Sequence, residues 1–284
     1  MIVDTCIVSS DLNPLYLDFF PLVHRIWREL AGVRCVLVLI SQALPERLQA
    51  HKNDIFLVTP RPDVEDGFQA QCIRLLAPQF LSDSRAVLLS DIDLIPMRRS
   101  YFLDSVAPLR DEALAIYRSD ALPGYDELPI CFNAASPATW SELLGPVKSL
   151  EEASDVISRW REGVDYGSPG SSGWTVDQRV LFQKVQAFDQ TRIRRFTDRE
   201  LNFRRLDRSE IAGEESFLQR FLAKSAQYSD YHMARPMERF AAANLRLADA
   251  ALHPRPISSA LARVATSATV AKLSSLVHRR LKSL

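Results

Sequence analysis

The chain has 284 residues, 47% of them hydrophobic and 25% charged, which is ordinary for a globular protein of one domain with a short appendage. No apolar run approaches the roughly 18 residues of a membrane span, and no basic region precedes the apolar N-terminal stretch, so neither a membrane span nor a secretion signal is predicted. The 35 basic and 35 acidic residues cancel, but positions 250–284 contain six bases and no acid, which leaves 29 bases against 35 acids elsewhere. An acidic body argues against nucleic acid as a partner.

Short apolar runs rich in Val, Ile and Leu predict an α/β fold whose strands are buried on both faces by helices. The predicted strands cover residues 2–8, 35–40, 55–58, 86–90 and 113–117. Apolar residues at helical spacing predict helices over 15–30 and 67–80. Because ligands bind such sheets at the carboxyl ends of the strands, the polar residues that follow each strand are the candidate site residues.

Four cysteines stand alone in apolar stretches, without CxxC spacing or a nearby histidine: Cys6, Cys35, Cys72 and Cys131. We interpret them as buried thiols in a reducing compartment and predict a cytoplasmic protein.

Asp91 and Asp93 follow directly on the predicted strand at 86–90. Two carboxylates at the end of a buried strand, where the backbone turns outward, can reach one hard cation such as Mn²⁺ or Mg²⁺. Such an ion would neutralise the charge that builds up on a departing nucleoside diphosphate. The alternative is that both acids merely cap the next element or are solvated.

The second half of the chain contains a glycine-rich segment, 163–173, that predicts a loop. Thr175 and Gln178 have the spacing of a capping box, which predicts that a helix follows this loop. Beyond residue 241 the chain becomes Ala-, Ser- and Arg-rich and ends in an amphipathic basic stretch. That stretch predicts one of two contacts. It binds the anionic inner face of a membrane, or it docks on the acidic body of the protein.

Several motifs resemble, in order, family-8-type glycosyltransferases, the group of glycogenin and the bacterial lipopolysaccharide galactosyl- and glucosyltransferases. SDLN at 10–13 is similar to the base-binding turn of that family, which implies that Asp11 and Asn13 meet the nucleobase and ribose. Tyr16 would stack on the base, although it follows the Asn by three places rather than one, and core packing is its alternative role. The segment GFQAQCIRLL resembles the helix that carries an Arg to the metal carboxylates, which implies this role for Arg74.

Three later segments extend the resemblance. ICFNAAS is similar to a Phe-Asn-x-Gly element and implies that Asn133 contacts the donor sugar, with Ala135 in place of the Gly. WTVDQ resembles the segment whose Asp-Gln pair, here Asp177 and Gln178, faces the anomeric carbon.

The last matching segment lies near residue 232. HMARP resembles the His-x-x-Gly-x-x-Lys-Pro element, with shorter spacing and no Gly. The match implies that His232 is the third metal ligand, beside Asp91 and Asp93, and that Arg235 meets the diphosphate.

The resemblance implies a GT-A fold with a mixed Rossmann-like sheet over residues 1–240. The implied fold divides into a nucleotide-sugar-binding half at 1–125 and an acceptor half at 126–240, and a helical basic tail follows at 241–284. It also implies a metal-dependent hexosyltransferase that uses a UDP-sugar, retains the anomeric configuration, and acts on a glycan or lipid-linked acceptor. The alternatives are an inactive nucleotide-sugar or membrane-binding module and a haloacid-dehalogenase-like phosphatase, which also places D-x-D after a buried strand.

Overall fold

The computed structural model describes residues 1–167, 170–211 and 227–253. The predicted amphipathic stretch of the basic tail lies outside the described residues. No described helix is both long and apolar enough to cross a membrane.

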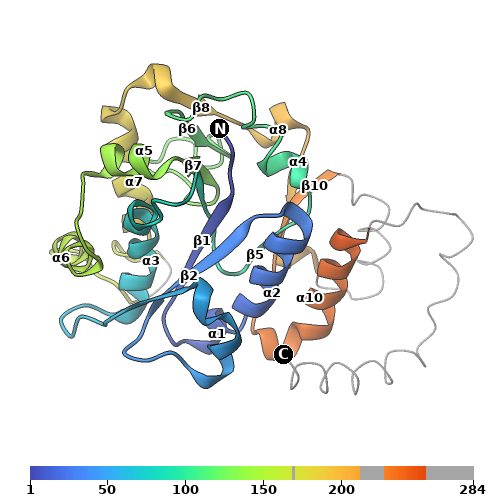
Figure 1. The fold of residues 1–284 in the computed structure, drawn as a ribbon, viewed down its shortest axis with the longest axis horizontal. Helices are drawn as coiled ribbons and strands as arrows, with labels where there is room; N and C mark the ends of the chain where they lie inside the picture. The colour runs from blue at the N-terminus through green and yellow to red at the C-terminus, as the bar shows by residue number, and fades with distance from the viewer. Residues whose placement is uncertain (168–169, 212–226, 254–284) are drawn as a thin grey trace, which may run out of the picture.

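A seven-stranded mixed sheet forms the centre of the described chain, in the order β3-β2-β1-β4-β7-β6-β8 (Figure 1). The strands are β1 (Thr5–Ser10), β2 (Arg34–Ile40), β3 (Ile55–Val58), β4 (Val87–Leu89), β6 (Leu114–Ile116), β7 (Asn133–Ala135) and β8 (Ile193–Arg195). The first four strands of the order run parallel, whereas β7 runs antiparallel to both of its neighbours. All five predicted strands are present, and the predicted α/β class is confirmed.

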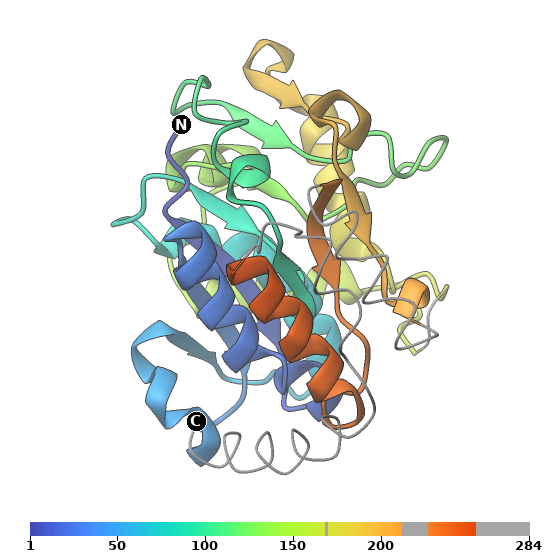
Figure 2. The same ribbon diagram turned by 90° about the vertical axis from the view of Figure 1, so that its right-hand side faces the viewer.

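Helices cover both faces of this sheet. They are α1 (Pro14–Leu17), α2 (Phe20–Ile26), α3 (Asp66–Leu76), α4 (Arg99–Phe102), α5 (Pro137–Leu144), α6 (Leu150–Arg161), α7 (Val176–Ala187), α8 (Asp198–Leu201) and α10 (Met237–Leu252). Helices α3, α5, α6 and α7 lie on one side of the sheet, while α2 and α10 lie side by side on the other (Figures 1 and 2).

Side chains of the parallel strands alternate between two cores, one on each face of the sheet. On β2, Cys35 and Leu37 pack in the core under α2 and α10, whereas Val36 and Val38 pack in the core under α3. Successive strand residues point to opposite faces, so a strand buried on both faces must be apolar throughout. This is why residues 35–40 of β2 are a continuous apolar run in the sequence. All four cysteines are buried free thiols, as predicted.

The two predicted helices are interrupted where proline removes a backbone donor. The stretch predicted at 15–30 forms α1, α2 and a π-helical turn over Trp27–Ala31, with Pro21 in the first turn of α2. Gly32, in the left-handed region at φ +69°, ends this run. The stretch predicted at 67–80 forms α3 and then a 3₁₀ turn over Ala77–Phe80 that contains Pro78.

The predicted helix after the glycine-rich loop is α7, but its predicted capping box is wrong. The Thr175 hydroxyl makes no capping hydrogen bond to the helix and instead donates to the Glu127 carboxylate at 2.5 Å. In a capping box this hydroxyl would accept from a backbone N–H of the first helical turn, and the contact with Glu127 holds the side chain where it does not.

A second sheet of three strands, in the order β5-β10-β9, lies beside the main one. It consists of β5 (Leu94–Pro96), β9 (Arg204–Leu206) and β10 (Tyr228–His232). Strand β5 follows Asp93 at once and pairs antiparallel with β10, with Leu94 opposite His232. The turn after β4 is thereby joined to β10, which lies more than 130 residues later in the chain.

Helix α10 runs across the predicted boundary at residue 240. Ala241, Leu247 and Ala248 are buried in the core that α2 also covers. The described part of the predicted tail, up to residue 253, therefore includes a helix that packs on the body.

Candidate active site

The candidate residues converge at the carboxyl edge of the main sheet. Parallel β1 and β4 are neighbours, with Leu89 at the end of β4 opposite Ile7, and each is followed by a candidate carboxylate, Asp11 after β1 and Asp91 after β4. Antiparallel β7 begins at this edge, with Asn133 opposite Leu89. The sheet register thus gathers residues from three separate parts of the chain.

Arg74 joins two of the predicted carboxylates. It donates from one terminal nitrogen to Asp91 and from the other to Asp177 Oδ2 at 2.8 Å. The other oxygen of Asp177 accepts from Gln71 Nε2 at 2.9 Å and from the backbone N–H of Gln178 at 2.9 Å. Arg74 and Gln71 come from α3 and Asp177 from the first turn of α7, so two helices position this pair.

The charges of this cluster act on one another. Partial burial alone would raise the pKa of Asp91, but Arg74, a hydrogen bond from Cys131 and the nearby Arg205 hold it at about 2. Burial would lower the pKa of Arg74, and its two carboxylate partners raise it instead, so the guanidinium stays charged. The pKa of Asp177 is raised, because its nearly complete burial outweighs the attraction of Arg74.

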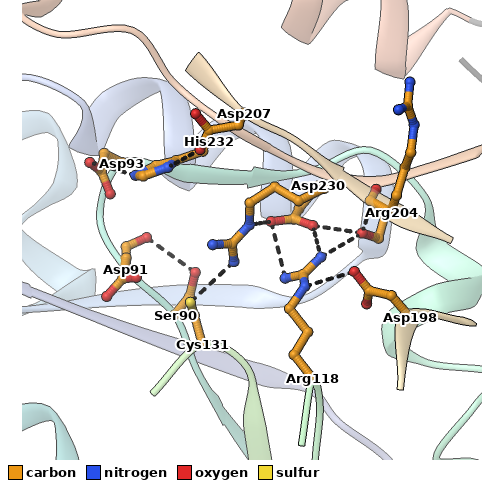
Figure 3. A network of polar contacts seen from close by, with 12 residues as sticks. Ser90, Asp91, Asp93, Arg118, Cys131, Asp198, Arg204, Asp207, Asp230 and His232 are labelled. Carbon is orange, nitrogen blue, oxygen red and sulfur yellow. Dashed lines mark hydrogen bonds and ion pairs between the residues drawn. The ribbon is translucent and has the colours of Figure 1, made fainter. Parts of the chain in front are cut away.

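A second group forms around Asp93, as the close view in Figure 3 shows. His232 Nε2 lies 3.4 Å from Asp93 Oδ2, and the other ring nitrogen, Nδ1, lies 2.9 Å from Asp207 Oδ2. The backbone also fixes this approach, because the N–H of Met233 donates to the Asp93 carbonyl at 2.9 Å. Burial would raise the pKa of Asp207, but hydrogen bonds from Ser209 and His232 lower it to about 2.

The Asp207 carboxylate accepts a hydrogen bond from His232 Nδ1–H, which orients the ring with Nε2 toward Asp93. A carboxylate that orients a histidine in this way is typical of metal sites. The Asp93 carboxylate and the His232 imidazole are two candidate ligands for a divalent cation, and the carboxylate suits Mn²⁺ or Mg²⁺. Asp91 lies two residues before Asp93 in the sequence but is engaged by Arg74. In the described part of the chain, no group of three or more His, Cys, Asp or Glu side chains is arranged to hold a metal ion.

Two further arginines approach the same oxygen of Asp93. Arg208 donates from Nη2 at 2.7 Å, and Arg235 Nε lies 3.8 Å away. The guanidinium of Arg235 also stacks over the ring of Tyr16, 5.1 Å from its centroid. Tyr16 packs partly against the core, as in its alternative interpretation. Arg235 thus bridges the turn after β1 and the turn after β4.

The residues of the predicted base-binding turn hold the turn itself together. Asp11 Oδ1 accepts from the backbone N–H of Asn13 at 3.0 Å, and Asn13 caps α1 by accepting from the N–H of Leu15 at 3.0 Å. The second oxygen of Asp11 faces Gly67, where an added Cβ would lie 3.6 Å from it and 2.9 Å from the Tyr166 hydroxyl.

Asn133 is buried at the start of β7, and its side-chain hydrogen bonds go to the segment that precedes it. Its amide nitrogen donates to the carbonyls of Pro129 and Ile130, each at 2.7 Å, while Oδ1 is buried without a hydrogen-bond partner among the described residues. The structure gives it no direct contact with Asp91, Asp93 or Asp177 in the described part of the chain. Its role toward a donor sugar stays a prediction.

Four residues at the site were not identified from the sequence: Gln71, Tyr166, Asp207 and Arg208. Gln71 lies three residues before Arg74 on α3, so helical spacing could have placed it on the same face. Tyr166 comes from the glycine-rich loop, which the sequence indicated without naming the residue, whereas Asp207 and Arg208 come from a segment without a recognised motif.

Comparison of the sequence with protein families and with curated proteins finds no match. Among solved structures, the fold is similar to glycosyltransferases. The galactosyltransferase LgtC, solved in complex with donor and acceptor sugar analogs, is 13% identical, with 87% of this chain and 95% of that one covered and a TM-score of 0.47. The glycosyltransferase GlyE of Streptococcus pneumoniae TIGR4 is 12% identical over 89% of this chain and 63% of that one, with a TM-score of 0.46.

A third similar structure is a glycosyltransferase involved in the glycosylation of the major capsid of PBCV-1. It is 12% identical over 86% of this chain and 98% of that one, with a TM-score of 0.42. At these identities the likeness concerns the fold and carries nothing about donor, acceptor or chemistry.

Proposed function

We propose that the protein is a metal-dependent glycosyltransferase that moves a sugar from a nucleotide-sugar, a UDP-sugar by the motif resemblance, to a glycan or lipid-linked acceptor. The observation that carries the proposal is the meeting of Asp93 with His232, which are 139 positions apart in the sequence, beside the Arg74 bridge from Asp91 to Asp177. The acceptor and the retention of configuration rest on the motif resemblance alone.

In this proposal Asp93 and His232 hold a Mn²⁺ or Mg²⁺ ion, and Asp91 completes the site from the same turn. When bound, such an ion neutralises charge on the departing diphosphate. Arg235 donates to the diphosphate from its place beside Asp93, and Asp11, Asn13 and Tyr16 form the turn that receives the nucleoside. The contacts that the ion and Arg235 would make with the diphosphate strengthen as negative charge moves onto the leaving group, so they favour the transition state over the ground state.

We assign Asp177 a role that acts largely through Arg74. Both carboxylate oxygens already accept hydrogen bonds, and the side chain is almost fully buried. Asp177 therefore fixes the direction of the guanidinium, while Gln178 at the same helix start and Asn133 at the start of β7 are proposed to border the sugar. This arrangement includes no dedicated general base.

The proposal is tested with a panel of UDP-, GDP- and dTDP-sugars, measured for binding by calorimetry and for slow donor hydrolysis with Mn²⁺, with Mg²⁺ and with EDTA. We expect one nucleotide class to bind and to be hydrolysed only with a divalent ion. Binding without hydrolysis would favour the inactive nucleotide-sugar-binding module. Release of phosphate from simple phosphate esters, with no binding of any nucleotide-sugar, would contradict both.

Loss of the Asp207 carboxylate is expected to lower the affinity of the site for the metal, although Asp207 itself is not a proposed metal ligand. In Asp207→Ala the His232 ring loses the acceptor that fixes its orientation and tautomer, so the Kd for Mn²⁺ should rise about 10- to 100-fold. The measurement is a Mn²⁺ titration followed by calorimetry. Asp207→Asn keeps an oxygen acceptor for Nδ1–H and serves as the matched control, with a smaller increase. Equal Kd values for Asp207→Ala and the wild type would show that the orientation of His232 does not depend on Asp207.

A further inference from the structure

Arg208 reaches the site from a segment that none of the motifs includes. It begins the 3₁₀ turn Arg208–Ile211, and its Nη2 donates to Asp93 Oδ2 at 2.7 Å. Its other terminal nitrogen, Nη1, is buried and has no hydrogen-bond partner among the described residues. A buried guanidinium nitrogen without an acceptor is costly, which is a reason to expect an anionic ligand at this place.

The position of Arg208 conflicts with a metal ion bound at Asp93. The oxygen that accepts from Arg208 is also the oxygen that faces His232 Nε2 at 3.4 Å and Arg235 Nε at 3.8 Å. A cation held between Asp93 and His232 must therefore share or displace the guanidinium, since two positive groups at one oxygen repel each other. Arg208 and a metal ion compete for Asp93.

The formal charges of the site favour the simultaneous binding of a cation and an anion. Three guanidinium groups, those of Arg74, Arg208 and Arg235, lie against the carboxylates of Asp91, Asp93 and Asp177. A divalent cation alone adds positive charge to this balanced group, and a diphosphate alone adds negative charge. Together they restore the balance, and the guanidinium released from Asp93 has a phosphate oxygen to bind, for which its planar donors are suited.

We propose that Arg208 exchanges between Asp93 and the diphosphate of the donor, so that metal and donor bind cooperatively. This inference rests on the proposed function. Without a diphosphate, Arg208 holds Asp93 and lowers the affinity for the metal. With a diphosphate, Arg208 moves to the phosphate oxygens and frees the carboxylate. By thermodynamic linkage, the metal raises the affinity for the diphosphate by the same factor.

The test is a set of calorimetric titrations of the full chain with Mn²⁺, with UDP, and with each in the presence of the other. In Arg208→Gln the competitor of the metal is gone, so the Kd for Mn²⁺ alone should fall about tenfold, as expected for removal of one charge-assisted hydrogen bond. The Kd for UDP in the presence of Mn²⁺ should rise about tenfold, because a phosphate partner is lost. The cooperativity between Mn²⁺ and UDP should shrink accordingly.

Two further variants separate this exchange from other effects. Arg110→Gln removes the same charge from a side chain that is 87% exposed, and it should leave both Kd values unchanged. Arg208→Lys keeps the positive charge but lacks the planar pair of donors of a guanidinium. It should bind Mn²⁺ with an affinity between those of the wild type and Arg208→Gln. It also serves as the test protein if Arg208→Gln does not fold.

A gain in metal affinity cannot arise from general damage to the site, so opposite changes in the two Kd values support the exchange. Unchanged or weaker Mn²⁺ binding in Arg208→Gln, while the wild type binds both Mn²⁺ and UDP, would overturn this inference and leave the proposed function intact. A wild-type protein that binds neither would overturn both.

Discussion

Asp93→Asn is expected to fold like the wild type and to transfer sugar about a thousandfold more slowly. Asn keeps the shape of the side chain but removes the charge that binds the cation, and an ion that stabilises the leaving diphosphate contributes several kcal/mol to the transition state. Asp91→Asn should behave in the same way, because Asp91 is the other acid of the turn after β4. The measurement is the initial rate of donor hydrolysis at saturating Mn²⁺, with thermal unfolding to verify the fold.

Asp83→Asn is the matched control for this loss. Its carboxylate is 75% exposed and lies 3.6 Å from Arg34, away from the candidate site residues, so hydrolysis should be unchanged. Near-wild-type hydrolysis in either Asp91→Asn or Asp93→Asn would remove that residue from the metal site. If Mn²⁺ still binds to both variants with wild-type affinity, the metal assignment is wrong.

Asp230→Ala is expected to destabilise the fold by about 3–5 kcal/mol, since it leaves buried guanidinium groups without their shared counter-ion. The Asp230 carboxylate is fully buried and accepts from Arg118, from Arg205 Nε at 2.8 Å and from Ser229 Oγ at 2.6 Å (Figure 3). These contacts join β10 to β9 and to the segment that follows β6. Thermal and urea unfolding measure the loss, which should lower the Tm by about 10 °C.

The pH dependence of this loss identifies its cause. Burial would raise the pKa of Asp230, but Arg118 and Arg205 outweigh burial and lower it. A carboxyl group whose pKa is lower in the folded state stabilises the fold above its unfolded pKa, about 3.9, and this contribution is lost as the pH falls through the folded value. The difference in unfolding free energy between wild type and Asp230→Ala should therefore be full at pH 7 and shrink below about pH 4.

An exposed ion pair provides the comparison for this large effect. Asp249 has a side chain that is 61% exposed and pairs with Arg25 at 3.0 Å, so Asp249→Ala should cost no more than about 1 kcal/mol. A loss of similar size in the two variants would show that burial of the Asp230 network does not determine its contribution.

The same network connects the two groups of candidate residues. Arg205 Nη2 lies 3.2 Å from Cys131 Sγ, and Arg205 and Cys131 both help to lower the pKa of Asp91. Asp230 lies two residues before His232 on β10, so both side chains point to one face of that strand. Buried charges that satisfy one another at a single geometry thereby hold β10 in place relative to the turn after β4.

The sequence by itself determined five of the seven strands of the main sheet and the candidate residues that stand within motifs, whereas β7 and β8 were not predicted. Runs such as CVLVLI at 35–40 are apolar at every position because both faces of the strand are covered, and this pattern can be read from the sequence alone. Asp91 and Asp93 were found because they follow directly on such a run. The strand register then fixes their place, since β1 and β4 are parallel neighbours.

Only the tertiary structure decided which side chains meet. Asp207 and Arg208 lie about 25 residues before His232 and more than 110 after Asp93, and no local pattern relates them; the pairing of β10 with β5 and β9 does. The capping box at Thr175 failed for the same reason, because Glu127, 48 positions away, holds the hydroxyl in a contact that the local sequence does not indicate. Hydrophobic periodicity reports the environment of one segment, whereas hydrogen bonds and ion pairs depend on side chains that distant segments bring within about 3 Å of each other.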